Sequence, residues 1–153
     1  MKITNGFSSV AYDKADWHAG GQGFPLDQPF QSFVHTGMFL GWIIEHHLCS
    51  QQIGLDAVHD FTNRKRTGPQ IYAQECDGCL IDYMLNDEGN AFTRHYFDLK
   101  RGIYIDDYSK LLARGLPNVY YVKDTWENYE IIKKQIDRRY HNWKTKKWYE
   151  FWK

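Results

Sequence analysis

The chain has no apolar segment long enough to cross a lipid bilayer, because its longest apolar run covers only residues 37–44. A membrane-spanning helix needs about 20 such residues. The first ten residues hold one Lys and no apolar run, so they lack the pattern of a secretory signal peptide. From these two absences we expect a cytoplasmic protein without a membrane partner.

Cysteine is scarce, with three residues in a chain of 153. An odd number without an export signal predicts reduced thiols rather than a disulfide framework. Cys76 and Cys79 form a Cys-x-x-Cys pair, which can begin a zinc site or a redox couple. A structural zinc site needs four ligands, and no second such pair exists, although Cys49 with His46 or His47 is a conceivable completion. We therefore expect no bound metal and no cofactor, and a turn between the two thiols.

The chain also lacks net charge, with 19 basic and 19 acidic residues. Nucleic-acid-binding domains usually carry a basic excess, so a nucleic-acid partner is not expected. The charge is unevenly placed, however: the net charge is −4 over residues 1–60, −1 over 61–100 and +5 over 101–153. The basic residues 64–66 and the Lys-rich, aromatic stretch 144–152 are interpreted as helix surface and helix end.

No short catalytic signature occurs in the sequence. Residues 20–23 are rich in glycine but lack the Lys and Ser or Thr of a phosphate loop, and they do not match the dinucleotide-binding fingerprint. A nucleophile-elbow serine, a zinc-protease motif and a kinase signature are also missing. We therefore expect that the protein is not an enzyme.

Two histidines keep a catalytic alternative open. His18 and His35 could approach Asp13, Asp16 or Asp82 after folding, and a His beside a carboxylate can act as a general base. A His beside an aromatic ring or a helix start is more often a structural, hydrogen-bonded residue. The alternative function is thus a small enzyme with a His/Asp site around His18 and His35.

The most regular pattern lies in the last thirty residues. Large apolar residues recur there every three or four positions, which is the period of one helix face. Asp124 and Glu127 suit a capping-box start. Because an isolated helix gains little stability, this face must be buried, and we expect the rest of the domain to pack on it. The apolar face comprises Trp126, Tyr129, Ile132, Ile136, Tyr140 and Trp143.

The remaining pattern predicts a mainly α fold, a compact helical bundle that forms one domain over residues 1–153. Residues 1–32 are expected to be mostly loop with a short strand near 7–12, and 145–153 form a basic, aromatic tail. A short β-prone segment is expected at 119–122. Gly37 and Gly41 share the apolar face of 33–48, which should be the buried central helix. Helices are predicted at about 33–48, 54–66, 69–77, 81–99, 104–113 and 124–152.

Several segments resemble a family of small, uncharacterised bacterial proteins. The similarity covers residues 12–144 and rests on WHAGG, HTGMFLGW, NDEGNAF, DTWENY and IDRRY, at residues 17–21, 35–42, 86–92, 124–129 and 136–140. This resemblance implies a helical single domain without an assigned activity, and it associates the chain with toxin–immunity loci. No catalytic residues come with the family, so none are transferred.

The function we expect is that of a non-enzymatic binding protein, an immunity protein that neutralises a cognate protein toxin. An inhibitor of this kind needs aromatic anchors and charges complementary to its target. Many intracellular toxins act on nucleic acid and would present a basic cleft, so the acidic front half is the expected contact surface. The residues predicted to bind the partner are Tyr12, Asp13, Asp16, Trp17, Asp27, Asp56 and Asp60.

Overall fold

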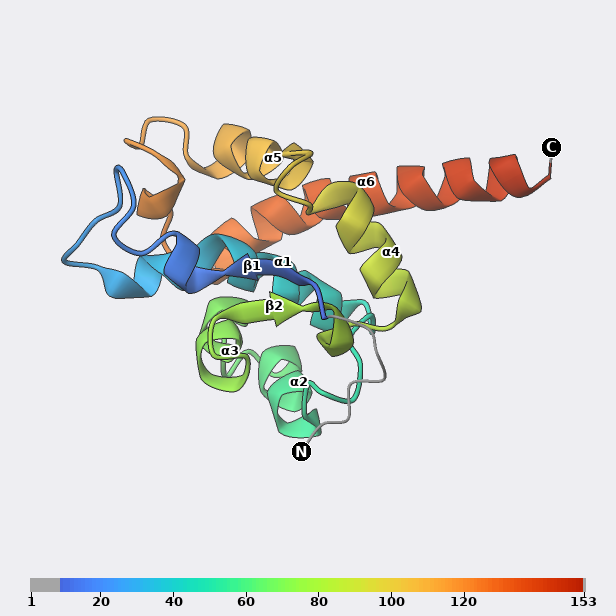
Figure 1. The fold of residues 1–153 in the computed structure, drawn as a ribbon, viewed down its shortest axis with the longest axis horizontal. Helices are drawn as coiled ribbons and strands as arrows, with labels where there is room; N and C mark the ends of the chain where they lie inside the picture. The colour runs from blue at the N-terminus through green and yellow to red at the C-terminus, as the bar shows by residue number, and fades with distance from the viewer. Residues whose placement is uncertain (1–8, 153) are drawn as a thin grey trace.

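The computed structural model describes residues 9–152 and confirms a compact, mainly α fold (Figure 1). Within these residues a single two-stranded sheet and several one-turn 3-10 helices accompany the α-helices. The α-helices are α1 (Val34–Glu45), α2 (Leu55–Thr62), α3 (Gly68–Glu75), α4 (Asp87–Tyr96), α5 (Ile103–Leu112) and α6 (Trp126–Phe151).

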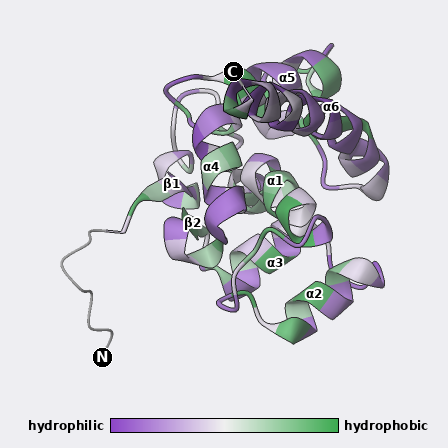
Figure 2. Ribbon diagram, turned by 90° about the vertical axis from the view of Figure 1, so that its right-hand side faces the viewer, coloured by the Kyte–Doolittle hydropathy of each residue, from purple (hydrophilic) through white to green (hydrophobic). Residues whose placement is uncertain are grey.

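Helix α1 occupies the centre of the molecule. Its residues 34–44 are all buried, and it contacts α2, α3 and α6. Figure 2 shows it enclosed by the other elements. The sequence predicted this burial, but it placed the organising role on the last helix. That assignment was wrong, because α1 is covered on every side while α6 contacts the body along one face only.

The contact between α1 and α3 depends on missing side chains. A Cβ atom on Gly37 would lie 2.2 Å from the Cα atom of Pro69, and one on Gly68 would lie 2.1 Å from the carbonyl oxygen of Gly37. The two backbones therefore approach as closely as only glycine allows. Helix α3 starts at this contact with a capping box, in which Thr67 accepts from the backbone N–H of Gln70 and the Gln70 side chain accepts in return.

The sheet pairs β1 (Ala11–Lys14) with β2 (Cys79–Ile81) in antiparallel orientation. The register aligns Ala11 with Ile81 and Lys14 with Cys79, with an irregularity between Ala11 and Asp13. The strand expected near residues 7–12 is thus present from Ala11, and residues 7 and 8 lie outside the described part. Two one-turn helices follow β1 before α1 begins, η1 (Ala15–Trp17) and η2 (Pro29–Phe33).

Two of the predicted segments have a different structure. The helix expected over 81–99 starts only at Asp87, because Ile81 ends β2 and η3 (Asp82–Met84) turns the chain. The segment 119–122 is not a strand but a 3-10 turn, η4 (Val119–Tyr121), in which the Asn118 side chain accepts from the backbone N–H of Tyr120. In both segments the apolar run is short, and in a short run the spacing of apolar residues does not distinguish a strand, a turn and a helix.

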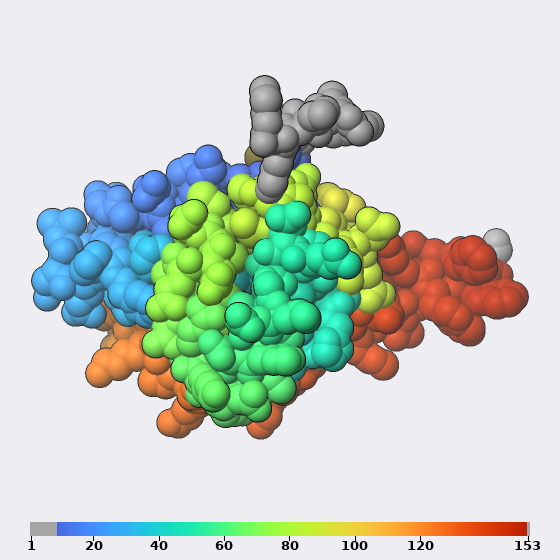
Figure 3. Space-filling view, turned by 90° about the horizontal axis from the view of Figure 1, so that it is seen from below, coloured from blue at the N-terminus to red at the C-terminus, as the bar shows by residue number. Residues whose placement is uncertain are grey.

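Helix α6 packs through the predicted face and then leaves the body. Its buried residues are Tyr129, Ile132 and Ile136, and Trp143 is the last large side chain packed against the core. The N-cap is Thr125, whose side chain accepts from the backbone N–H of Asn128; the capping box expected at Asp124 is wrong. Beyond residue 144 every described residue is exposed, and Figure 3 shows this end standing clear of the molecule.

None of the helices within residues 9–152 combines the length and apolar character that a bilayer span requires.

Candidate functional site

The structure brings Asp13, His18 and His35 together beside the start of α1. One carboxylate oxygen of Asp13 lies 2.7 Å from Nε2 of His18, and the other lies 3.6 Å from Nε2 of His35. The two imidazole rings meet edge to face, with centroids 4.5 Å apart. Three separate segments supply these side chains: β1, the residue after η1, and the first turn of α1.

Two hydroxyl groups orient this cluster, which we call the Asp13 cluster (Asp13, His18 and His35). Thr36 donates to the Asp13 carboxylate over 2.5 Å, and Tyr120 of η4 lies 2.9 Å from Nδ1 of His18. Neither Thr36 nor Tyr120 was singled out from the sequence. Thr36 adjoins His35, a signal that could have been used, whereas Tyr120 lies 102 residues from His18 and no local pattern links them.

The Asp13 cluster is buried. The side chains of Asp13, His35 and His18 are 0%, 3% and 15% exposed. Burial lowers the pKa of His35 to about 4, although the Asp13 carboxylate acts in the opposite direction. His35 is therefore a neutral imidazole at neutral pH, and Asp13 is enclosed next to it.

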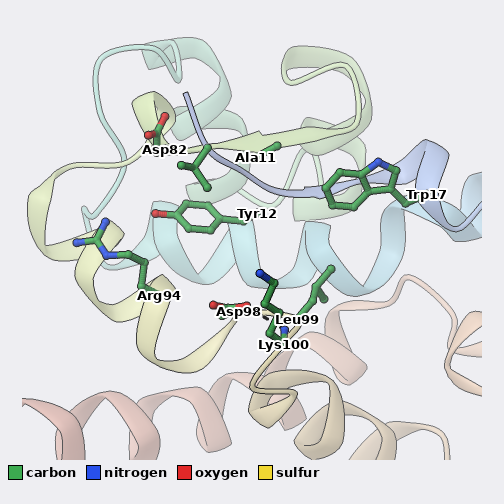
Figure 4. Close-up of a pocket in the computed structure, with 9 residues that line it drawn as sticks. Ala11, Tyr12, Trp17, Asp82, Arg94, Asp98, Leu99 and Lys100 are labelled. Carbon is green, nitrogen blue, oxygen red and sulfur yellow. Dashed lines mark hydrogen bonds between the residues drawn. The ribbon is translucent and has the colours of Figure 1, made fainter. Parts of the chain in front are cut away.

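A hollow of about 400 Å³ lies beside β1, and its walls include Tyr12 and Trp17 (Figure 4). The Trp17 ring is 55% exposed, while Tyr12 is buried and donates its hydroxyl hydrogen to the side chain of Asn90 over 2.7 Å. Leu99 adds a partly exposed apolar side chain to the same wall. The hollow thus combines two aromatic rings with an apolar patch, which is the composition of many binding surfaces.

Four charged side chains complete the hollow, two acidic and two basic. Asp82 follows β2, Arg94 belongs to α4, and Asp98 and Lys100 follow α4. In Figure 4, Arg94 and Tyr12 extend toward the same part of the cavity. From the sequence, Asp82 was expected only as a partner for histidine and Arg94 was not identified, because the pairing of β1 with β2 that places them together was not predicted.

The seven predicted partner-binding residues do not form one surface. Tyr12, Asp13, Asp16 and Trp17 share the β1–η1 segment, but Asp13 is enclosed and only Asp16 and Trp17 are exposed. Asp27 is exposed in the loop before η2. Figures 1 and 2 place α2, which carries Asp56 and Asp60, away from β1.

Asp60 is also engaged within the protein. Its carboxylate lies 2.8 Å from Nε of Arg66, which in turn contacts Glu75. Asp56 is exposed in the first turn of α2, where a negative charge complements the helix dipole. The basic residues 64–66 are therefore partly neutralised: besides these pairs, Arg64 contacts Glu130 at 2.6 Å and lies over the ring of Trp126.

The Cys-x-x-Cys segment forms the turn from α3 into β2. Asp77 and Gly78 both have positive φ, at 51° and 67°, so the chain reverses within two residues. All three cysteines are free thiols. Burial raises the pKa of Cys76 to about 12, with nearby acidic groups acting in the same direction, so this thiol stays protonated at neutral pH.

Residues 11–122, most of the chain, match a protein family described as "Domain of unknown function (DUF7832)". The protein is therefore a member of this family. The matched region contains the Asp13 cluster and the lining of the hollow apart from Val10, and it ends before α6. Neither a curated protein nor a solved structure was found that matches the chain.

Proposed function

We propose that this member of the DUF7832 family is a protein-binding module that acts by binding a partner protein rather than by catalysis. The observation that carries the proposal is the hollow beside β1, where an exposed Trp17 adjoins an apolar wall and charged side chains of both signs. Exposed aromatic side chains around a concavity are typical of protein interfaces.

The volume and lining of the hollow fit a protruding side chain of a partner. A cavity of about 400 Å³ admits one or two large side chains, and Tyr12, Trp17 and Leu99 would contact their apolar parts. Asp82 and Asp98 would pair with basic groups of the partner, and Arg94 and Lys100 are placed for acidic groups.

The partner we propose is a protein toxin met in the cytoplasm, and the protein would then be its immunity protein. This finer assignment rests on the resemblance to proteins of toxin–immunity loci. The exposed Asp16 and Asp27 support it, because acidic groups complement a toxin with a basic active-site cleft. Association should then be faster at low salt, since screening weakens over the larger Debye length.

In a toxin–immunity locus the toxin is expected in the gene immediately upstream, so co-expression with the C-terminal domain of that gene's product tests this proposal. We expect a complex on affinity purification and rescue of growth. Trp17→Ala should weaken the complex by roughly tenfold or more, as substitutions of central aromatic anchors do. Trp148→Ala is the matched control, because Trp148 is similarly exposed but lies at the end of α6, and it should bind like the wild type.

Absence of both complex and rescue would contradict the immunity assignment. Equal weakening by Trp17→Ala and Trp148→Ala would contradict the assignment of the hollow while leaving a binding function in place. Circular dichroism of both variants separates lost contact from lost fold.

A second candidate is the small enzyme with a His/Asp site. It is favoured by the contact of both His18 and His35 with one carboxylate. Against it, both ring nitrogens of His18 already have partners, Asp13 and Tyr120, and the lining of the hollow beside β1 includes neither histidine. If rescue requires His18 while the His18→Gln variant folds and still binds the toxin, catalysis replaces binding as the explanation.

A further inference from the structure

We infer that Asp13, His18 and His35 form a binding site for one divalent transition-metal ion. Each residue offers one ligand atom, and these atoms all lie within 4.8 Å of one another. Within residues 9–152 no other group of three His, Cys, Asp or Glu side chains meets that condition. Two imidazoles and one carboxylate are a ligand set that binds zinc and ferrous iron in other folds.

The charge at the site supports a bound cation. Asp13 is fully buried, and no Lys or Arg of the described residues pairs with it. Its hydrogen-bond donor Thr36 is neutral, so the nearest nitrogen groups are the two imidazoles of His18 and His35. An enclosed carboxylate without a counter-charge costs several kcal/mol. A divalent ion would compensate it, and a neutral imidazole is the form that binds metal.

The distances require small movements of His18 and of the Asp13 carboxylate. Two ligands about 2.0–2.1 Å from a tetrahedral ion are separated by about 3.3 Å. Nε2 of His35 lies 3.6 Å from Oδ2 of Asp13, close to that value, whereas Nε2 of His18 lies 2.7 Å from Oδ1, which is a hydrogen-bond distance. The two imidazoles face different oxygens of one carboxylate, so His18 must retreat by about half an ångström and the carboxylate must turn to present one oxygen to the ion. Of the three side chains His18 is the most exposed, so it has the most freedom to move.

Thr36 and Tyr120 act as positioning residues for this ligand set. The Thr36 hydroxyl fixes one oxygen of Asp13, and Tyr120 occupies the ring nitrogen of His18 that faces away from the carboxylate. Such outer partners orient ligands and set the histidine tautomer. The site is separate from the Cys-x-x-Cys turn, on which the sequence-based expectation of no metal rested.

Titration of the full-length protein with Zn²⁺ and Co²⁺ tests the inference. Calorimetry should give one ion per chain, and the cobalt spectrum should show the visible bands of nitrogen and oxygen ligands without a thiolate charge-transfer band. This spectrum needs no variant, so the result does not depend on whether a substituted cluster folds.

Variants then assign the ligands. His18→Gln and His35→Gln should weaken binding by more than the roughly 10–100-fold that loss of an outer partner causes, and Tyr120→Phe should weaken it about tenfold. The matched control is His46→Gln, because His46 also contacts a carboxylate, Asp137, at 3.0 Å but lies outside the cluster. This control and the Cys76→Ser/Cys79→Ser double variant should bind like the wild type.

Three results would overturn the inference. They are the absence of one-to-one binding by the wild type, a thiolate band in the cobalt spectrum, and unchanged affinity in a folded His18→Gln variant. In each of these cases the Asp13 cluster is a structural hydrogen-bond network, and a metal, if bound, belongs elsewhere.

Discussion

Helix α1 and the free end of α6 contain the same kinds of residue in opposite surroundings. In α1, Phe39 and Trp42 are fully buried, and Phe39 stacks on Phe97 with ring centroids 4.7 Å apart. At the end of α6, Trp148 and Phe151 are 63% and 82% exposed. The difference teaches that aromatic content alone does not locate a core. What distinguishes α1 is the close approach of neighbouring backbones, which its glycines permit.

Replacing one tryptophan by alanine in each helix should give the largest difference in unfolding free energy between the two. Trp42→Ala removes a fully buried ring and the hydrogen bond that its Nε1–H donates to Asp137, so it should cost about 3–5 kcal/mol of unfolding free energy. Trp148→Ala should change stability by no more than about 0.5 kcal/mol. Urea unfolding followed by circular dichroism measures both, and similar costs would refute the comparison.

Glycine substitutions sharpen the account of why α1 is central. Gly37→Ala should cost about 1–3 kcal/mol, because its new Cβ meets the backbone of Pro69 and either α1 or α3 must shift. Gly41→Ala should cost less, since the nearest atoms belong to the side-chain ring of Phe61 and the nearest backbone atom, Cα of Gly68, lies 3.5 Å away. Thermal unfolding of the two variants gives the order, and a larger cost at Gly41 would contradict this explanation.

The ion pair between Asp107 of α5 and Arg139 of α6 should contribute less to stability in acid. Burial raises the pKa of Asp107, but hydrogen bonds from Arg139 and Tyr96 outweigh this effect and leave the pKa below its ordinary value. A lowered folded pKa contributes stability above the unfolded pKa, near 3.9, and loses it as the pH falls through the folded value.

We therefore expect the stability difference between the wild type and Asp107→Asn to be constant above about pH 5 and to shrink below about pH 4. Its plateau should be about 1 kcal/mol, because Arg139 is 43% exposed and solvent screens the pair. Unfolding free energies measured from pH 2 to 7 test this, and a difference that grows in acid would show the opposite pKa shift.

The smallest effect should follow removal of residues 145–153. All side chains described there are exposed, so the shortened chain should unfold within about 0.5 kcal/mol of the full-length protein. Its helical signal should fall in proportion to the residues removed. Loss of the folded state on this truncation would mean that the free end of α6 stabilises the body.

The spacing of apolar residues along the chain correctly predicted the helix faces that are buried. The burial of α1 followed from apolar spacing with two glycines, and the packed face of α6 followed from the period between Trp126 and Trp143. Where the observed structure depends on distant partners, prediction failed. Ile81 fits a helical period with Leu85, yet it pairs with Ala11 in the sheet, a contact across seventy residues of chain.

The candidate site illustrates both outcomes. The approach of His18 and His35 to Asp13 was among the contacts considered from the sequence, and the structure shows it. Asp13 was also assigned to a partner-binding surface as part of the acidic front half, and that assignment was wrong because its side chain is buried. Its burial depends on His35 and Thr36, which α1 supplies from more than twenty residues away. A lysine at residue 13 would consequently replace the carboxylate that contacts both histidines with a buried cation and disrupt the fold, whereas a lysine at the exposed residue 16 should not.

The placement of Tyr120 against His18 has a consequence for synthesis of the chain. Asp13 and His18 are made among the first residues, but β2 and η4, which complete their surroundings, are made about 65 and 100 residues later. At about 5–20 residues per second, the N-terminal segment waits roughly 5–20 s for Tyr120 to be added. The His18–Tyr120 contact therefore cannot form until most of the chain has been made, and a nascent chain arrested before residue 120 would lack it.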